Sequence, residues 1–426
     1  MTSLLIKNGR VINPGSGQDR VCDVRIEAGK ITAIGTNLPA AKQEVDASGC
    51  YVMPGLVDIH VHLRDPGFTH KEDIESGAKA AARGGVTTMV AMPNTKPVVD
   101  SVSQVRYVYE KAEKVAPIHI LQVAAITKNQ NGTELADIKG LVEAGAAAIS
   151  EDGKSVMDSG LYREAMKLAA ELDIPVLAHC EDINLVEDGV VNADERTKAL
   201  GLKGISNAVE DVIVARDILL AKETGARLHL CHCSTADSVD MVKTAKEEGL
   251  SVTAEVCPHH FILTTEDIKD TDTNYKMNPP IRTRQDVDAL VKGLQLDIMD
   301  VIATDHAPHS AEEKNQSMEK APFGIVGLET LVPLTITALV DKGILTPMQM
   351  AQKTSYNPAK ILGIDKGTLT EGKSADIVII DPNVEYRIDS EEFVSKGKNT
   401  PFHGYLVKGR VMMTICDGEI VYNFEK

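Results

Sequence analysis

Histidine and aspartate side chains fall at the ends of several apolar, strand-like runs of this sequence. His60 and His62 are two residues apart, so in a strand they lie on the same face. Neutral imidazoles combined with carboxylates form a ligand set suited to divalent zinc. Any one of these histidines alone is more simply explained as a hydrogen-bonded core residue. Six such residues, all at strand ends, instead predict a metal site: His60, His62, Asp152, His179, His232 and Asp305.

An alternation of strands and helices is expected to position these residues. Apolar strand-like runs lie at 57–62, 86–93, 118–126, 146–150, 175–180, 227–233, 251–257 and 300–306. Most segments between them are rich in Ala, Glu, Lys and Leu, which is typical of helices. Eight strands alternating with helices predict an α/β fold, a closed (β/α)8 TIM barrel whose active site forms at the carboxyl ends of its strands. No glycine-rich dinucleotide fingerprint follows an early strand, which argues against a Rossmann fold.

Both ends of the chain are rich in short β-runs separated by glycine turns. Residues 1–53 contain three such runs, and residues 363–426 contain KSADIVIIDP and GYLVKGRVMMTICDGEIVY. Neither end is long enough for an independent β-domain. We therefore expect the two ends to combine into one small β-domain beside a catalytic barrel at 54–362.

Length and charge narrow the function further. The chain has 426 residues, and a TIM barrel takes roughly 250, which leaves room for a smaller domain. Its net charge of −17 repels phosphate backbones, so a nucleic-acid partner is not expected. Seven cysteines without paired spacing indicate reduced thiols in a cytoplasmic protein. Neither a signal peptide nor an apolar run of about 18 residues is found, so no membrane span is expected.

Two longer motifs make the sequence recognisable. Residues 54–67, PGLVDIHVHLRDPG, closely resemble the first signature of dihydroorotases, and residues 303–309, ATDHAPH, resemble the second. The wider family is the amidohydrolase superfamily, and the resemblance covers nearly the whole chain. It implies the reversible cyclisation of N-carbamoyl-L-aspartate to (S)-dihydroorotate in de novo pyrimidine (UMP) biosynthesis. In the hydrolytic direction, a hydroxide on the metal would attack the ring amide carbonyl.

The resemblance also implies a metal centre and a proton shuttle. Two zinc ions are favoured, and the six strand-end residues named above match the family's ligands. The superfamily more commonly has a carbamylated lysine after the fourth strand. Here the sequence is ISEDGKS, and Asp152 looks like the bridging ligand of type I dihydroorotases, with Lys154 as the alternative. Asp305 is implied both to bind metal and to pass the hydroxide proton to the leaving nitrogen.

Substrate contacts follow from the same resemblance. Arg64 and Asn94, joined by His309, are implied to bind the substrate carboxylate, which a guanidinium can take bidentately. For Arg64 the alternative is a surface salt bridge. The polar segment 310–324 is expected to be a mobile lid. The full set of implied substrate contacts is His62, Leu63, Arg64, Asn94, Asn278, His309, Phe323 and Gly324.

Two other functions stay open at this point. The first is a related cyclic amidase, such as a hydantoinase, dihydropyrimidinase or allantoinase, whose substrates lack the carboxylate that Arg64 and Asn94 would bind. The second is a catalytically silent homologue that serves as a scaffold for a transcarbamoylase. Every expected ligand is present, which argues against silence. The expected partner is a small-molecule substrate, while a homodimer and an association with aspartate transcarbamoylase are possible.

Several neighbouring residues are interpreted as structural. Cys231 and Cys233 flank His232, so strand alternation predicts that they face the helices, and His229 with them. His259 and His260 follow the seventh strand and are also interpreted as structural.

Overall fold

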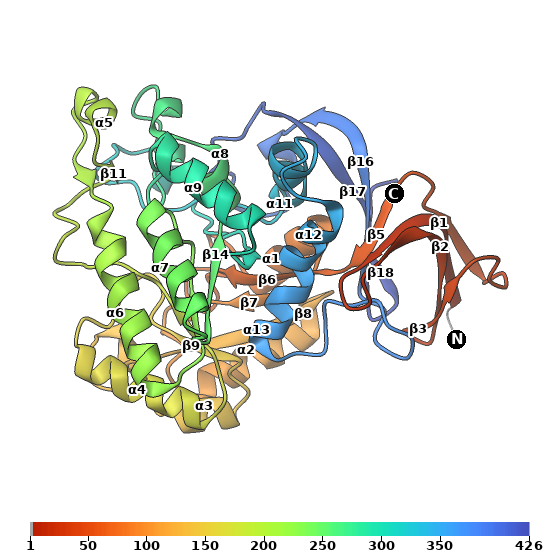
Figure 1. The fold of residues 1–426 in the computed structure, drawn as a ribbon, viewed down its shortest axis with the longest axis horizontal. Helices are drawn as coiled ribbons and strands as arrows, with labels where there is room; N and C mark the ends of the chain where they lie inside the picture. The colour runs from red at the N-terminus through yellow and green to blue at the C-terminus, as the bar shows by residue number, and fades with distance from the viewer. Residues whose placement is uncertain (1–2, 426) are drawn as a thin grey trace.

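The computed structural model describes residues 3–425 and contains a closed parallel barrel with a second β-sheet beside it (Figure 1). Neighbouring barrel strands pair in chain order. A parallel bridge between Val61 and His306 closes the ring, and the His62 N–H donates to the His306 carbonyl at 2.9 Å. The TIM barrel is confirmed, and each predicted run overlaps one of its strands. These are β6 (Leu56–Val61), β7 (Val86–Ala91), β8 (His119–Ala125), β9 (Ala148–Ser150), β10 (Val176–Ala178), β13 (Leu228–Leu230), β14 (Val252–Val256) and β15 (Val301–Ile302).

Helices form the outer layer of the barrel (Figure 1). Asp73 starts α1 with a reciprocal capping box to Ser76, and Gly225, with a φ of 71°, ends α6 in the left-handed conformation that favours glycine. None of the helices within residues 3–425 is long and apolar enough to cross a membrane. The longer helices are α1 (Ile74–Arg83), α2 (Val102–Val115), α4 (Ser159–Glu171), α6 (Ala208–Thr224), α7 (Ala236–Glu247) and α9 (Arg284–Gln295). Shorter ones are α3 (Ile138–Glu143), α5 (Glu195–Ala199), α8 (Pro258–Ile262), α10 (Ala311–Lys314), α11 (Leu331–Thr335), α12 (Pro347–Ala351) and α13 (Asn357–Leu362).

Two apolar layers enclose the barrel strands. Every residue of β6 and β7 is buried, as expected for parallel strands covered on both faces. An inner cluster fills the ring with side chains from strands all around it, including Val57, Val90, Val123 and Leu177. A larger cluster packs the helices against the outside of the strands. The strand ends at the mouth of the ring are therefore supported by apolar packing on both faces of the strands.

One prediction about side-chain direction is wrong. Cys231 belongs to the inner apolar cluster, and His229 is fully buried with its Nε2 3.0 Å from Glu255 Oε2, so neither faces the helices. Cys233 does pack in the helix layer. The physical reason lies at His232, whose φ of 33° breaks the alternation of the strand. Counting outward from His232 therefore assigned the wrong face to the residues before it.

The second sheet is built from both ends of the chain. Its strands are ordered β18-β17-β16-β5-β1-β2-β3, with β4 pairing β1, and the antiparallel β5–β16 pair joins the two ends. It has its own apolar core, and it carries none of the predicted site residues. The strands are β1 (Ser3–Asn13), β2 (Gln18–Glu27), β3 (Lys30–Gly35), β4 (Gln43–Asp46), β5 (Tyr51–Pro54), β16 (Ile377–Arg387), β17 (Leu406–Cys416) and β18 (Glu419–Asn423). A separate two-stranded ladder pairs β11 (Val191–Asn192) with β12 (Gly204–Ile205).

Candidate metal centre

The histidines that end β6 converge with two carboxylates from distant parts of the ring. His60 Nε2 lies 3.2 Å from Asp152 Oδ1, and His62 Nε2 lies 3.4 Å from Asp152 Oδ2. His62 Nε2 also lies 3.0 Å from Asp305 Oδ1, which follows β15. All four side chains are buried. The two oxygens of Asp152 therefore face two different imidazoles.

The histidines that follow β10 and β13 complete the cluster from the other side. His179 Nδ1 lies 2.9 Å from His232 Nε2 and 3.5 Å from Asp152 Oδ1. His232 Nε2 lies 3.7 Å from the same oxygen. Asp152 thus stands between the two pairs of histidines, and all six predicted ligands meet in one buried cluster.

Unsatisfied atoms in this pocket fit a bound cation. His60 Nε2 and Asp152 Oδ1 are buried and have no hydrogen-bond partner among residues 3–425. A buried polar atom without a partner costs about 1–3 kcal/mol, so two of them side by side need an explanation. Groups of imidazole and carboxylate atoms here lie within 4.8 Å of one another. Nitrogen and oxygen donors in this number suit a divalent metal.

Electrostatics point the same way. Burial by itself raises the pKa of Asp152, but the charge of His60 and the nearby imidazoles of His179 and His232 outweigh it and hold this pKa well below its usual value. Burial lowers the pKa of His179, yet the neighbouring carboxylates of Asp152 and Glu181 raise it to about 10. Raised histidine pKa values show that the buried cluster stabilises added positive charge.

Three of the histidines are oriented by a second group. His60 Nδ1 lies 2.7 Å from Glu255 Oε1, so the ring presents Nε2 to the centre. His62 Nδ1 lies 2.9 Å from Asn94 Oδ1, and His179 Nε2 lies 3.0 Å from Glu181 Oε2. These contacts fix which nitrogen of each ring faces inward.

Sequence reasoning missed two of these groups, Glu255 and Glu181. Glu255 is fully buried on β14, where it also contacts His229 and accepts the His232 backbone N–H at 3.0 Å. A glutamate inside the apolar run SVTAEVC was the available signal for it. No comparable pattern marks Glu181, because it follows the strand.

The predicted carboxylate-binding residues lie together at the barrel mouth. Arg64, with a φ of 58°, donates from Nε to the Pro308 carbonyl at 3.3 Å, and its Nη2 lies 3.4 Å from His309 Nε2. Burial lowers the pKa of Arg64 to about 10, although Asp305 opposes this effect, so the guanidinium stays charged at neutral pH. His309 Nε2 donates to the Phe323 carbonyl at 2.8 Å.

Two predicted substrate amides are linked to predicted metal ligands. Asn94 contacts His62 through its oxygen, as described above, which leaves its Nδ2 for a substrate. Asn278 Nδ2 donates to Glu181 Oε1 at 2.9 Å, and Glu181 in turn contacts His179. Each amide is therefore positioned by the same contacts that orient a ligand histidine.

Three predicted or alternative residues have their groups engaged elsewhere, although Gly324 lies beside His309. The Leu63 side chain is buried in the helix layer. The Gly324 N–H donates to the Lys276 carbonyl, and the Gly324 carbonyl accepts a hydrogen bond from Asn399 Nδ2. Both backbone groups of Gly324 are therefore already engaged. Lys154 is the alternative bridging residue. Its ammonium donates a hydrogen bond to the Gln130 carbonyl at 3.0 Å.

The segment 310–324 folds over this side of the barrel and contains the short helix α10. The buried Lys314 ammonium donates to the carbonyls of Lys276, Pro322 and Gly324 at 3.1–3.3 Å. These bonds tie the two ends of the segment to the loop that follows β14. Its mobility remains a prediction.

Comparison with known proteins adds independent information. Residues 49–238 match the model of the dihydro-orotase-like family, and residues 326–422 match that of the amidohydrolase family. A dihydroorotase of Clostridioides difficile is 52% identical, over 99% of this chain and 100% of its own length. A dihydroorotase of Acetivibrio thermocellus is 47% identical, over 98% of each chain.

Solved structures resemble the whole fold. An L-hydantoinase (dihydropyrimidinase) from Arthrobacter aurescens superposes with a TM-score of 0.90 at 27% identity, covering 99% of this chain and 96% of that one. A dihydropyrimidinase from Brevibacillus agri gives a TM-score of 0.86 at 25% identity, covering 100% and 96%. The fold is thus shared, over nearly the whole chain, with an L-hydantoinase and a dihydropyrimidinase.

Proposed function

The chain belongs to the dihydroorotase family of the amidohydrolases, and from this premise we propose that it interconverts N-carbamoyl-L-aspartate and (S)-dihydroorotate. It is a cyclic amide hydrolase. The proposed substrate is supported mainly by the position of Arg64 and Asn94 beside the buried cluster of imidazoles and carboxylates. A substrate with both a ring amide and a carboxylate fits that arrangement.

Two zinc ions are proposed for the centre. His60, His62 and Asp305 would hold one, His179 and His232 the other, and Asp152 would bridge them. The support is that Asp152 Oδ1 faces His60, His179 and His232 while Oδ2 faces His62. When bound, the metal supplies a water with a pKa of about 7 and polarises a carbonyl oxygen.

Asp305 is proposed to move the proton. Burial raises its pKa, but the charges of His60 and His62 outweigh that effect and lower it, so the carboxylate is ionised at neutral pH as a proton acceptor must be. Ring opening leaves an amide nitrogen that is a poor leaving group unless it is protonated. Asp305 would accept a proton from the attacking water and deliver it to this nitrogen.

Arg64, Asn94 and His309 are proposed to read the substrate carboxylate, with Asn278 near the ring. Burial and the neighbouring Arg64 charge lower the pKa of His309 to about 2, so its imidazole is neutral. The guanidinium then supplies the positive charge, and hydrogen bonds to the amide and the imidazole would orient the carboxylate. His62 and Phe323 lie next to these groups and complete the proposed contacts.

The decisive experiment is hydrolysis of dihydroorotate by protein whose metal content has been measured. Turnover with about two zinc ions per chain is expected, and removal of the metal should abolish it. Dihydrouracil and hydantoin, which lack the carboxylate, serve as comparison substrates. Turnover of these compounds at a rate similar to that of dihydroorotate would favour the hydantoinase alternative.

The remaining proposals concern organisation. We propose a catalytic domain at 54–362 and a small β-domain formed by 1–53 and 363–426. All seven cysteines are free, which supports a reducing compartment such as the cytoplasm. A homodimer and a complex with aspartate transcarbamoylase are testable by light scattering of the protein alone and of the two proteins mixed.

A further inference from the structure

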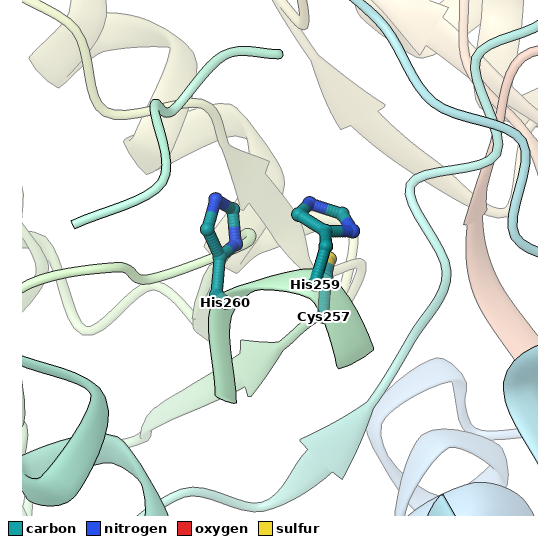
Figure 2. A group of neighbouring side chains, drawn as sticks. All are labelled: Cys257, His259 and His260. Carbon is teal, nitrogen blue, oxygen red and sulfur yellow. The ribbon is translucent and has the colours of Figure 1, made fainter. Parts of the chain in front are cut away.

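A second group of buried ligand atoms lies at the end of β14, separate from the six ligands above. It consists of Cys257, His259 and His260, whose side chains are 0%, 3% and 1% exposed. Their sulfur and nitrogen ligand atoms all lie within 4.8 Å of one another. Figure 2 shows the two imidazoles rising from one turn, with the sulfur of Cys257 beside the base of His259.

The tautomer of His260 is set by one contact. Its Nε2 lies 2.9 Å from the Pro279 carbonyl oxygen. A carbonyl only accepts hydrogen bonds, so Nε2 must carry the proton. Nδ1 is therefore a lone pair, and it is buried without a hydrogen-bond partner among residues 3–425.

His259 presents a second unpartnered nitrogen. Its Nε2 is also buried without a partner in the described part of the chain, and the two rings lie 4.2 Å apart, centroid to centroid. Burial lowers the pKa of His260 to about 3 and that of His259 well below its usual value. The lone pair on His260 Nδ1 therefore lacks a group that accepts it, and the His259 tautomer protonated on Nδ1 would present a second such lone pair on Nε2.

We propose that Cys257, His259 and His260 form a separate binding site for a thiophilic divalent cation such as Zn²⁺. Two imidazole nitrogens and a thiolate are ligands that zinc prefers, and three protein ligands leave one position for water. On binding, the Cys257 S–H bond breaks, a sulfur–metal bond forms and the proton passes to solvent. The bound ion and the thiolate together carry one positive charge.

A cation at this site would also affect the position of the predicted substrate-binding residue Asn278. A cation on His260 Nδ1 makes its Nε2–H a stronger donor to the Pro279 carbonyl. Pro279 directly follows Asn278, so the cation would hold the loop that carries this amide. Only this link rests on the proposed function, because the binding itself depends on the three ligands alone.

Cobalt provides a probe that distinguishes the two sites. The main centre has only nitrogen and oxygen ligands, whereas a thiolate bound to Co²⁺ gives an intense near-ultraviolet charge-transfer band. We expect this band when the purified enzyme is titrated with Co²⁺, and we expect added Zn²⁺ to remove it. Metal analysis after Zn²⁺ saturation should give one ion more per chain in the unmodified protein than in Cys257→Ser.

Matched variants complete the test. Cys257→Ser and His260→Gln should each lose the band or weaken Co²⁺ binding at least tenfold, while an unchanged far-ultraviolet circular dichroism spectrum reports that the chain is folded. Cys233→Ser, which changes an equally buried thiol in the helix layer, should keep it. If Cys257→Ser fails to fold, His260→Gln carries the test.

Absence of the band in the unmodified enzyme would overturn the proposal and leave a buried water as the partner of the two nitrogens. A band that persists in Cys257→Ser would also overturn it and assign the thiolate to Cys231, which lies near His60.

Discussion

Two buried polar clusters of the barrel differ in whether their hydrogen bonds are complete. Around Arg282, which is 2% exposed, Nε donates to Ser234 Oγ at 3.0 Å and Nη1 donates to Asn192 Oδ1 at 2.9 Å, with Glu210 3.7 Å from Nη2. In the metal centre, by contrast, buried nitrogen and oxygen atoms face one another without partners. The closed cluster holds segments of the chain together, and the open one keeps lone pairs for a ligand.

The largest expected effect concerns the open cluster. Asp305→Asn should lower kcat by about 10²–10⁴-fold in both directions, because the amide does not accept the proton that general acid–base catalysis moves. Unfolding in urea should change little. The measurement is turnover at a verified metal content. Activity within tenfold of the unmodified enzyme, with metal retained, would remove Asp305 from the mechanism.

Arg282→Met tests the closed cluster and should show the opposite pattern. Removing one partner of a buried ion pair leaves Glu210 uncompensated, which costs about 3–5 kcal/mol of unfolding free energy. The folded fraction should keep its metal and its kcat/KM. Denaturant unfolding monitored with the activity assay checks both. Adding Glu210→Gln should recover part of the loss, and an unchanged unfolding midpoint in Arg282→Met would refute the comparison.

A smaller effect is expected at the rim of the open cluster. Arg64→Met should lower kcat/KM for dihydroorotate by about ten- to a hundredfold, since charge-assisted hydrogen bonds contribute roughly 1.5–3 kcal/mol. Metal content should hold. Dihydrouracil turnover by the same variant is the control, because a substrate without the carboxylate has nothing for Arg64 to bind. An equal loss on both substrates would mean that Arg64 acts structurally.

The smallest expected effect is on the pH dependence of stability, and it concerns Asp217, a buried ionisable group outside both clusters. Asp217 is buried and lies 2.8 Å from Arg216 Nε, yet burial raises its pKa to about 6. Between its ordinary value near 3.8 and 6, the folded state binds more protons than the unfolded state. The free energy of unfolding contributed by this group therefore falls as pH rises through that window. Asp217→Asn should remove this slope, by less than one proton, when urea unfolding is compared at several pH values. A slope identical in both proteins would contradict the assignment.

The barrel and the cluster of six polar residues at its strand ends were predictable because both leave periodic signals. Apolar runs separated by helical segments predict the eight strands, and polar residues at their ends predict the pocket. Alternation failed where the backbone leaves strand geometry, as at His232, so the positions of His229 and Cys231 were assigned to the wrong face.

Contacts made by isolated residues were harder to predict. Glu181 follows a strand without any pattern, and its contacts to His179 and Asn278 depend on loops from different parts of the chain. The engaged backbone of Gly324 depends in the same way on Lys276 and Asn399. Such contacts are set by three-dimensional packing, which local sequence does not encode.

The contacts between the last and the first barrel strand join distant parts of the chain. His62 and Asp305 meet although 243 residues separate them, and bringing such distant segments together is slow and entropically costly. Five of the six proposed ligands precede the last strand in the sequence, and only Asp305 follows it. If these residues bind metal as proposed, the complete ligand set would form only when the eighth strand docks against the first.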